Sequence, residues 1–110
     1  MSAQIDRTLA ALADPARRQV IDILREQPLR AGELAVRASV SPPAMSRHLR
    51  ALRQSGLVEE DHDGFDARVR VYRLKPGPMA DLKDWLEETE RLRSLQQPSF
   101  KAHVVRAKDV

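Results

Sequence analysis

The chain has 110 residues, 42% of them apolar and 32% charged with a net charge of +3, which indicates one globular domain without room for a second core. It contains no cysteine, and this excludes a disulfide framework, a thiolate metal site and a cysteine nucleophile. No apolar run reaches the roughly 20 residues that cross a bilayer, and the first residues lack a secretory-signal pattern, so no membrane is expected and the expected location is the cytoplasm.

Three short helices are predicted before residue 39. The first follows from apolar residues at helical spacing: Ile5, Leu9 and Leu12. Asp14 can cap a second helix, and Pro15 suits its first position. The apolar stripe of this second helix is Ala16, Val20, Ile23 and Leu24. Gln27-Pro28 is expected to end it, and a third helix is expected over 31–38.

A fourth helix is predicted from Ser41, a good N-cap before two prolines, to about Ser55. Its apolar stripe is Met45, Leu49 and Leu52. Gly56 is typical of a helix C-terminal stop. Two helices joined by a short turn, the second capped and basic on its outward side, favour a helix-turn-helix.

An extended segment begins at Leu57-Val58, and Asp63-Gly64 predicts a hairpin turn. The expected return strand contains Val69, Val71, Tyr72 and Leu74. Its alternation is imperfect, since Val69 and Val71 share one face while Tyr72 and Leu74 share the other. Either a bulge or burial of both faces near the strand end would explain this pattern.

A last long helix is predicted after the break at 75–78. Its larger apolar residues and their neighbours are Met79, Leu82, Trp85, Leu86, Thr89, Leu92 and Leu95. The predicted fold is therefore mostly α with a β-hairpin wing, a winged helix-turn-helix in the order α-α-α-α-β-β-α. Residues 1–95 are expected to form this domain and residues 96–110 a C-terminal tail, in which Phe100, Val104 and Val105 dock or fray.

The charge is unevenly distributed along the chain. Residues 34–58 contain four arginines and no acid, residues 59–66 contain five acids and no base, and residues 67–75 carry four further cations. Of the 19 cations, 15 are arginine, whose planar fork of donors suits phosphate and base edges. A solvated face would explain a single basic run, but two acid-free basic segments indicate a footprint for a polyanion.

The outward half of the fourth helix contains the candidate base contacts. Arg47 can donate to guanine O6 and N7 in a major groove, and Ser46 can reach a base edge or a phosphate. Arg50 and Arg53 are better placed for phosphates, while His48 lies beside the apolar stripe and either packs or contacts DNA. The alternative is that these polar residues only keep an amphipathic helix soluble.

Arg68 and Arg70 form the second candidate region, as residues on one side of the return strand that enter the minor groove or contact phosphates. The acidic tip before them would be repelled by DNA, so the tip is expected to angle away or to be neutralised by Arg68.

Catalysis has little support in the sequence. The three histidines are far apart and match neither a triad nor a zinc spacing, and there is no glycine-rich phosphate loop. Asp61-His62-Asp63 is better explained as a solvated turn than as a metal patch. No enzyme activity, cofactor or metal is expected.

Four segments together resemble one family. They are Leu12-Ala13-Asp14-Pro15-Ala16-Arg17-Arg18, Gly32-Glu33-Leu34-Ala35, Ser41-Pro42-Pro43-Ala44-Met45-Ser46-Arg47-His48-Leu49 and Leu52-Arg53-Gln54-Ser55-Gly56-Leu57-Val58. This pattern is similar to that of the ArsR-type winged helix-turn-helix repressors, over roughly residues 4–95. The resemblance implies a sequence-specific DNA-binding repressor acting as a homodimer on an inverted repeat. It implies base reading by Ser46 and Arg47 with Pro43, Ala44 and His48 nearby, and wing contacts by Arg68 and Arg70.

The resemblance also implies that the first and last helices pack across the two-fold axis. The interface residues expected on this basis are Ile5, Leu9, Leu82, Trp85, Leu86, Thr89 and Leu92. The chain departs from the metal-sensing members, because Ala35 and Arg37 stand where they place cysteines and Lys83 stands where they place a histidine after Asp81. It therefore resembles the cysteine-free branch, and no metal site is expected.

Two alternative functions are open from the sequence. One is a winged-helix module for protein interaction or dimerisation that does not bind DNA. The other is a metal sensor with a non-cysteine site that draws on His62, His103 and carboxylates. Neither the operator nor any small-molecule effector is specified by the sequence.

Overall fold

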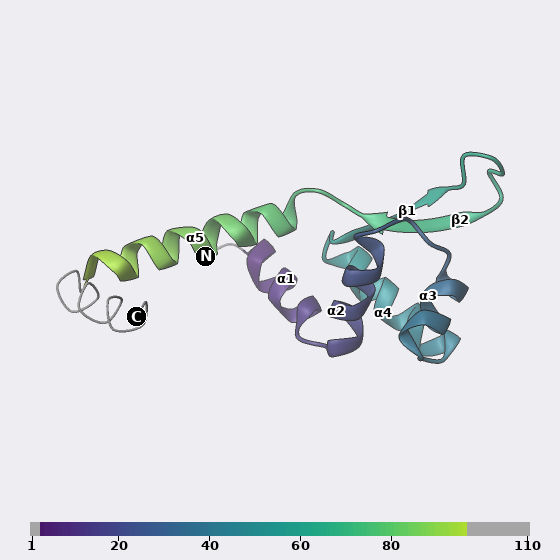
Figure 1. Cartoon of the computed structure of the whole chain (residues 1–110), viewed down its shortest axis with the longest axis horizontal. Helices are drawn as coiled ribbons and strands as arrows, with labels where there is room; N and C mark the ends of the chain where they lie inside the picture. The colour runs from purple at the N-terminus through teal and green to yellow at the C-terminus, as the bar shows by residue number, and fades with distance from the viewer. Residues whose placement is uncertain (1–2, 97–110) are drawn as a thin grey trace, which may run out of the picture.

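The computed structural model describes residues 3–96, which form five helices and one hairpin (Figure 1). In chain order these are α1 (Ala3–Leu12), α2 (Pro15–Leu24), α3 (Ala31–Ala38), α4 (Pro42–Gln54), β1 (Val58–His62), β2 (Arg70–Leu74) and α5 (Pro78–Gln96). This order confirms the predicted winged helix-turn-helix. The expected tail, including Phe100, Val104 and Val105, lies outside the described residues apart from Gln96, the last residue of α5.

Local hydrogen bonds explain where the first helices begin and end. The Asp14 carboxylate accepts from the Ala16 and Arg17 backbone N–H groups at 2.8 and 3.4 Å, so it caps α2 as predicted. The Arg18 guanidinium donates to the Leu12 carbonyl at 2.7 Å and closes the end of α1. α2 ends at Leu24, earlier than the predicted Gln27-Pro28, and Leu29 then exchanges backbone hydrogen bonds with Tyr72 of the wing at 3.1 and 2.8 Å.

The turn of the helix-turn-helix is stabilised on both sides. Ser39 takes a left-handed conformation with φ 55° and ends α3, and the next residue, Val40, donates to the Ala35 carbonyl at 3.0 Å. Ser41 then accepts from the Ala44 backbone N–H at 3.2 Å and caps α4 as predicted. The orientation of α4 relative to α3 is thus fixed locally.

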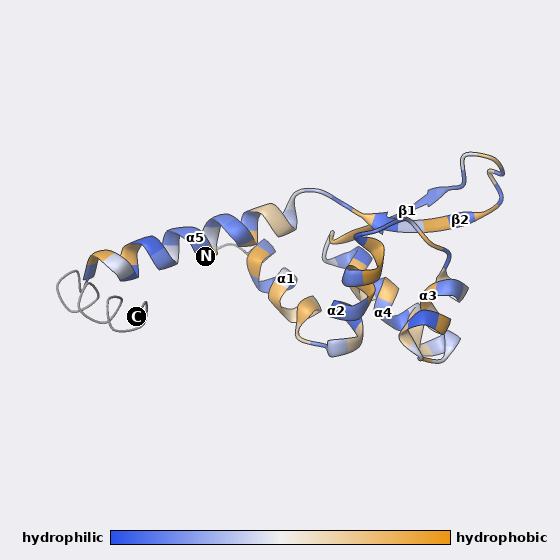
Figure 2. Cartoon of the chain, viewed as in Figure 1, coloured by the Kyte–Doolittle hydropathy of each residue, from blue (hydrophilic) through white to orange (hydrophobic). Residues whose placement is uncertain are grey.

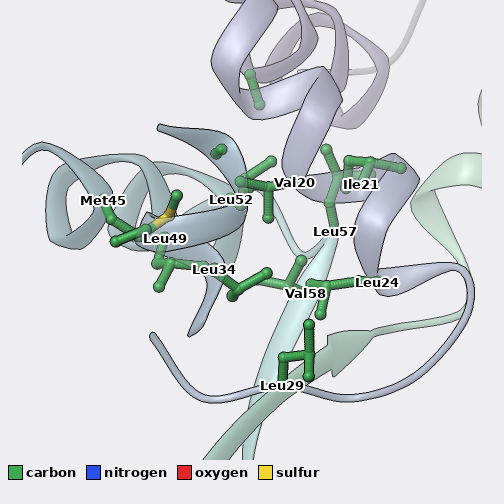
Figure 3. Close-up of a cluster of buried hydrophobic side chains, with 13 residues drawn as sticks. Val20, Ile21, Leu24, Leu29, Leu34, Met45, Leu49, Leu52, Leu57 and Val58 are labelled. Atoms are coloured by element: carbon green, nitrogen blue, oxygen red, sulfur yellow. The ribbon is translucent and has the colours of Figure 1, made fainter. Parts of the chain in front are cut away.

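A single apolar cluster lies where α2, α3, α4 and β1 meet (Figure 3). The predicted stripe of α4 is fully used, since Met45 and Leu52 have no exposed surface and Leu49 is 2% exposed. Ile21 rather than Ile23 is the buried isoleucine of α2, and Ile23 packs at the edge. With three α4 side chains buried, the opposite side of that helix must face outward.

The hairpin differs from the prediction at its tip. The five pairs from Val58↔Leu74 to His62↔Arg70 are continuous, so the hairpin contains no bulge within the paired strands, and Val71 and Tyr72 are both half-buried. Asp63-Gly64 lies in the hairpin connection as predicted, but this connection is longer than a two-residue turn and includes Val69, which the sequence pattern places in the return strand. The connection spans residues 63–69, Gly64 has no positive φ, and the Asp63 backbone N–H closes the loop on the Val69 carbonyl at 2.8 Å.

Helix α5 extends away from the helical body, on the side opposite the wing (Figure 1). It packs mainly against α1. The radius of gyration is 18.5 Å, whereas a compact domain of this size has about 13 Å. A long helix that projects from the body leaves apolar surface that the other elements within residues 3–96 do not cover.

Candidate nucleic-acid interface

Helix α4 presents a polar face opposite the apolar cluster. Pro43, Ser46, Arg47 and Arg50 are exposed, and Ala44 and His48 are half-buried at the edges of this face. No acidic side chain belongs to the helix. The structure therefore brings the predicted α4 residues together on one basic, outward-facing surface.

The arginines of α4 are not equivalent. Within residues 3–96, the guanidinium groups of Arg47 and Arg50 take part in no hydrogen bond or ion pair. Arg53, one turn further, donates to the Glu60 carboxylate at 3.3 Å. Arg47 and Arg50 are thus free for an external acceptor, whereas Arg53 already has one.

Glu60 is the centre of a polar cluster between α4 and the wing. Its carboxylate accepts from Arg53 Nη1 at 3.3 Å, from Arg70 Nη1 at 2.7 Å and from the Tyr72 hydroxyl at 3.0 Å. The Glu60 side chain is only 16% exposed, while those of Arg53 and Arg70 are 51% and 67% exposed. The hydrogen bond from Tyr72 and the two guanidinium charges hold the pKa of Glu60 below its usual range, although desolvation opposes this. Burial and the Glu60 contact raise the pKa of Tyr72.

The sequence did not reveal this cluster. Glu60 was one of five acids in a run, and its position opposite Tyr72 depends on the strand register. Alternation along each strand can pair residue 60 with residue 72 only once the length of the loop is known, and the sequence does not specify that length.

The loop at the wing tip neutralises part of its own charge. Arg68 donates through Nε and Nη2 to the Asp66 carboxylate, both at 3.2 Å, and this contact, with the Arg68 backbone N–H, lowers the pKa of Asp66. Arg68 precedes β2 rather than belonging to it, so it does not share a strand face with Arg70 as predicted. Its side chain is 90% exposed. Phe65, in the same loop, is fully exposed.

His48 lies near the N-terminus of α2. It is half-buried. Desolvation alone would raise the pKa of the nearby Asp14 carboxyl, but the Ala16 and Arg17 backbone hydrogen bonds, together with electrostatic interactions with His48 and Arg17, lower this pKa below its usual value. The side chain thus faces α2 and the edge of the exposed surface.

A second surface runs along α1 and α5. Leu9, Leu86 and Leu92 are 41%, 51% and 47% exposed, and Trp85 is half-buried. Ile5 and Leu82 are each 8% exposed, because α1 and α5 already pack together within the chain. Figure 2 shows the apolar residues of α5 interspersed with hydrophilic ones along the projecting arm. Thr89 is exposed beside this surface.

Within residues 3–96, no group of three or more histidine or acidic side chains is placed to hold a metal ion. Over the same part of the chain, no helix is long and apolar enough to span a membrane.

A helix-turn-helix with an exposed basic second helix, followed by a hairpin and a closing helix, defines a winged helix-turn-helix protein. Residues 14–60 match the model of the family described as bacterial regulatory protein, arsR family. The chain is 42% identical over 82 residues to the HTH-type transcriptional regulator Rv2034 of Mycobacterium tuberculosis, covering 74% of each chain. The chain therefore belongs to the arsR family of bacterial regulatory proteins, a family of transcriptional regulators rather than enzymes.

Two further similarities extend the comparison. The chain is 27% identical over 82 residues to the transcriptional repressor SdpR of Bacillus subtilis, covering 74% of this chain and 88% of that protein. The solution structure of the homodimeric winged helix-turn-helix DNA-binding domain of Mb0332 from Mycobacterium bovis is 28% identical and has a TM-score of 0.59. That similarity covers 92% of this chain and 82% of the other.

Proposed function

We propose that this chain is a homodimeric transcriptional repressor that binds a short inverted repeat in double-stranded DNA, independently of metal. The observation that carries this proposal is the exposed face of α4, where Arg47 and Arg50 have no acceptor within residues 3–96 while the opposite stripe is completely buried. Membership of the arsR family supports it.

In this proposal α4 lies in the major groove. Arg47 donates its planar fork to guanine O6 and N7, and Ser46 contacts a base edge or a phosphate. Arg50 and Arg53 follow the phosphate backbone, as do Arg68 and Arg70 from the wing. Pro43, Ala44 and His48 border the contact at the start and edge of the helix.

The dimer is proposed to form through α1 and α5. The relative from Mycobacterium bovis is homodimeric, and the projecting α5 arm exposes apolar side chains that a second copy would cover. The proposed interface consists of Ile5, Leu9, Leu82, Trp85, Leu86, Thr89 and Leu92, with Ile5 and Leu82 supporting it from beneath. Two α4 helices would then enter successive major grooves about 34–36 Å apart.

Metal independence is supported by residue chemistry at the two positions of α3 that the family resemblance singles out. Ala35 has no donor atom, and Arg37 is a permanent cation that cannot ligate a metal. We further propose that residues 1–95 act as one domain, and that the protein acts in the cytoplasm.

Fluorescence anisotropy tests this function. A labelled duplex taken from upstream of the gene is titrated with protein at physiological salt, beside a scrambled duplex of equal length and composition. We expect the protein to bind the upstream duplex at least about tenfold more tightly than the scrambled one, with binding coupled to formation of the dimer. Equal affinity for both duplexes refutes sequence-specific binding, and a dimer that binds neither, even at low salt, favours a protein-interaction module instead.

A further inference from the structure

The carboxylate of Glu60 connects two DNA-facing elements. Arg53 belongs to the last turn of α4, and Arg70 begins the return strand of the wing. Both donate through Nη1 to the same carboxylate, at 3.3 and 2.7 Å. The two side chains are otherwise 17 residues apart and on separate elements, so this carboxylate fixes their relative positions.

Tyr72 fixes the carboxylate in turn. Glu60 and Tyr72 are directly paired across the hairpin, and the phenol donates to Glu60 Oε2 at 3.0 Å. Since the Glu60 side chain is 16% exposed and uses both oxygens, it has little freedom to turn away. The donors, by contrast, are half-exposed or more, and remain accessible to an external phosphate.

We propose that Glu60 is a positioning residue that makes DNA binding selective, by holding Arg53 and Arg70 in one arrangement and competing with non-specific phosphate for both. This role rests on the proposed function. Because the two guanidiniums are half-exposed or more, each of their ion pairs with Glu60 adds only a modest amount to folding stability, and the same contacts also act on DNA binding. Without the carboxylate, two free guanidiniums would attach to any phosphate backbone.

The change Glu60→Gln removes the charge and keeps the shape and a hydrogen-bond acceptor for Tyr72. One fewer negative charge at the interface makes the slope of log K against log salt steeper by about 0.9, which corresponds to about fivefold tighter non-specific binding near 0.15 M salt. Operator binding is expected to tighten by less, because the two arginines must then be ordered during binding. The ratio of operator to scrambled affinity should therefore fall, by up to about fivefold if operator affinity does not change.

The hairpin supplies a matched control in Glu59→Gln. Glu59 is the neighbour of Glu60 on β1, lies on the opposite face, and pairs with Arg73 at 3.1 Å. The same charge is removed from the same strand, but neither Arg53 nor Arg70 loses its partner. This variant should keep the selectivity ratio of the wild type.

A DNA-free readout tests the cluster itself. Tyr72 is the only tyrosine in the sequence, so phenolate absorbance reports its ionisation alone. The groups facing it are Glu60, Arg53 and Arg70. Glu60→Gln should lower the pKa of Tyr72 toward the ordinary value, and Glu59→Gln should leave it unchanged. If Glu60→Gln does not fold, Tyr72→Phe removes the phenol hydrogen bond and should lower selectivity by a smaller factor.

The experiment measures anisotropy of operator and scrambled duplexes at several salt concentrations for the wild type and both glutamine variants. A loss of selectivity in Glu60→Gln alone, with the steeper slope, supports the role. Equal changes of the selectivity ratio in both variants would mean a bulk charge effect and would overturn the proposed role of Glu60. A loss of affinity of Glu60→Gln for both duplexes, with an unchanged salt slope, would overturn it as well. A wild type without any preference refutes the proposed function itself, and this role with it.

Discussion

Leu86 on the projecting α5 helix provides the most direct test of the proposed dimer surface. Its side chain is 51% exposed in the single chain, and a partner α5 would cover it. Leu86→Ala removes three carbon atoms, each worth about 0.8 kcal/mol when fully buried. Because about half of that surface is already covered, the loss is about 1.2 kcal/mol per side chain and about 2.4 kcal/mol for the two copies.

This loss corresponds to an increase of about 50-fold in the dimer dissociation constant. Sedimentation equilibrium over a range of protein concentrations measures that constant directly. Val36→Ala is the matched control, since Val36 is 77% exposed but lies on α3, away from α1 and α5. It should leave the constant unchanged. If Leu86→Ala and Val36→Ala dimerise as tightly as each other, the proposed interface is in the wrong place.

Three further outcomes are expected. Arg47→Ala should weaken operator binding by about 1–3 kcal/mol and relax the base preference at one position, whereas Arg53→Ala should mainly reduce the salt slope, by about 1, both by anisotropy; loss of the base preference in Arg53→Ala alone would reverse these roles. Leu34→Ala, at a fully buried site, should lower the free energy of unfolding in urea by about 2–5 kcal/mol, and a loss below 1 kcal/mol would contradict the described core. Glu60 and Asp14 have lowered pKa values in the folded chain. Their contribution to stability is therefore present above the unfolded-state pKa values near pH 4 and is lost as the pH falls through the folded-state pKa values. The midpoint of thermal unfolding should fall between pH 6 and pH 3, by less in Glu60→Gln than in the wild type, and a constant midpoint in the wild type would contradict this.

The helices were predictable from the sequence because their signals are local. Asp14-Pro15 and Ser41-Pro42 each combine a capping side chain with a proline at the first helical position, and the structure confirms both starts. The α4 stripe of Met45, Leu49 and Leu52 was equally clear, because one face of a helix repeats every three or four residues. Once that stripe is buried, the outward position of Arg47 follows.

The wing tip and the Glu60 cluster were not predictable in the same way. Asp63-Gly64 is a good local turn signal, but the loop instead closes at Val69 with the Asp63 and Asp66 side chains bonded to nearby backbone N–H groups. That longer loop sets the register, and the register decides that Glu60 faces Tyr72. A contact between Arg53 and Glu60 depends further on how the wing packs against α4, which no local pattern specifies.

Selection of binding sites from a pool of randomised duplexes, using purified wild-type protein, tests the central claim most directly. Repeated rounds should enrich an inverted repeat whose half-sites are centred about 10 base pairs apart, as two α4 helices in successive major grooves require. A pool that remains random after selection, or a single half-site without symmetry, would contradict sequence-specific binding by a homodimer.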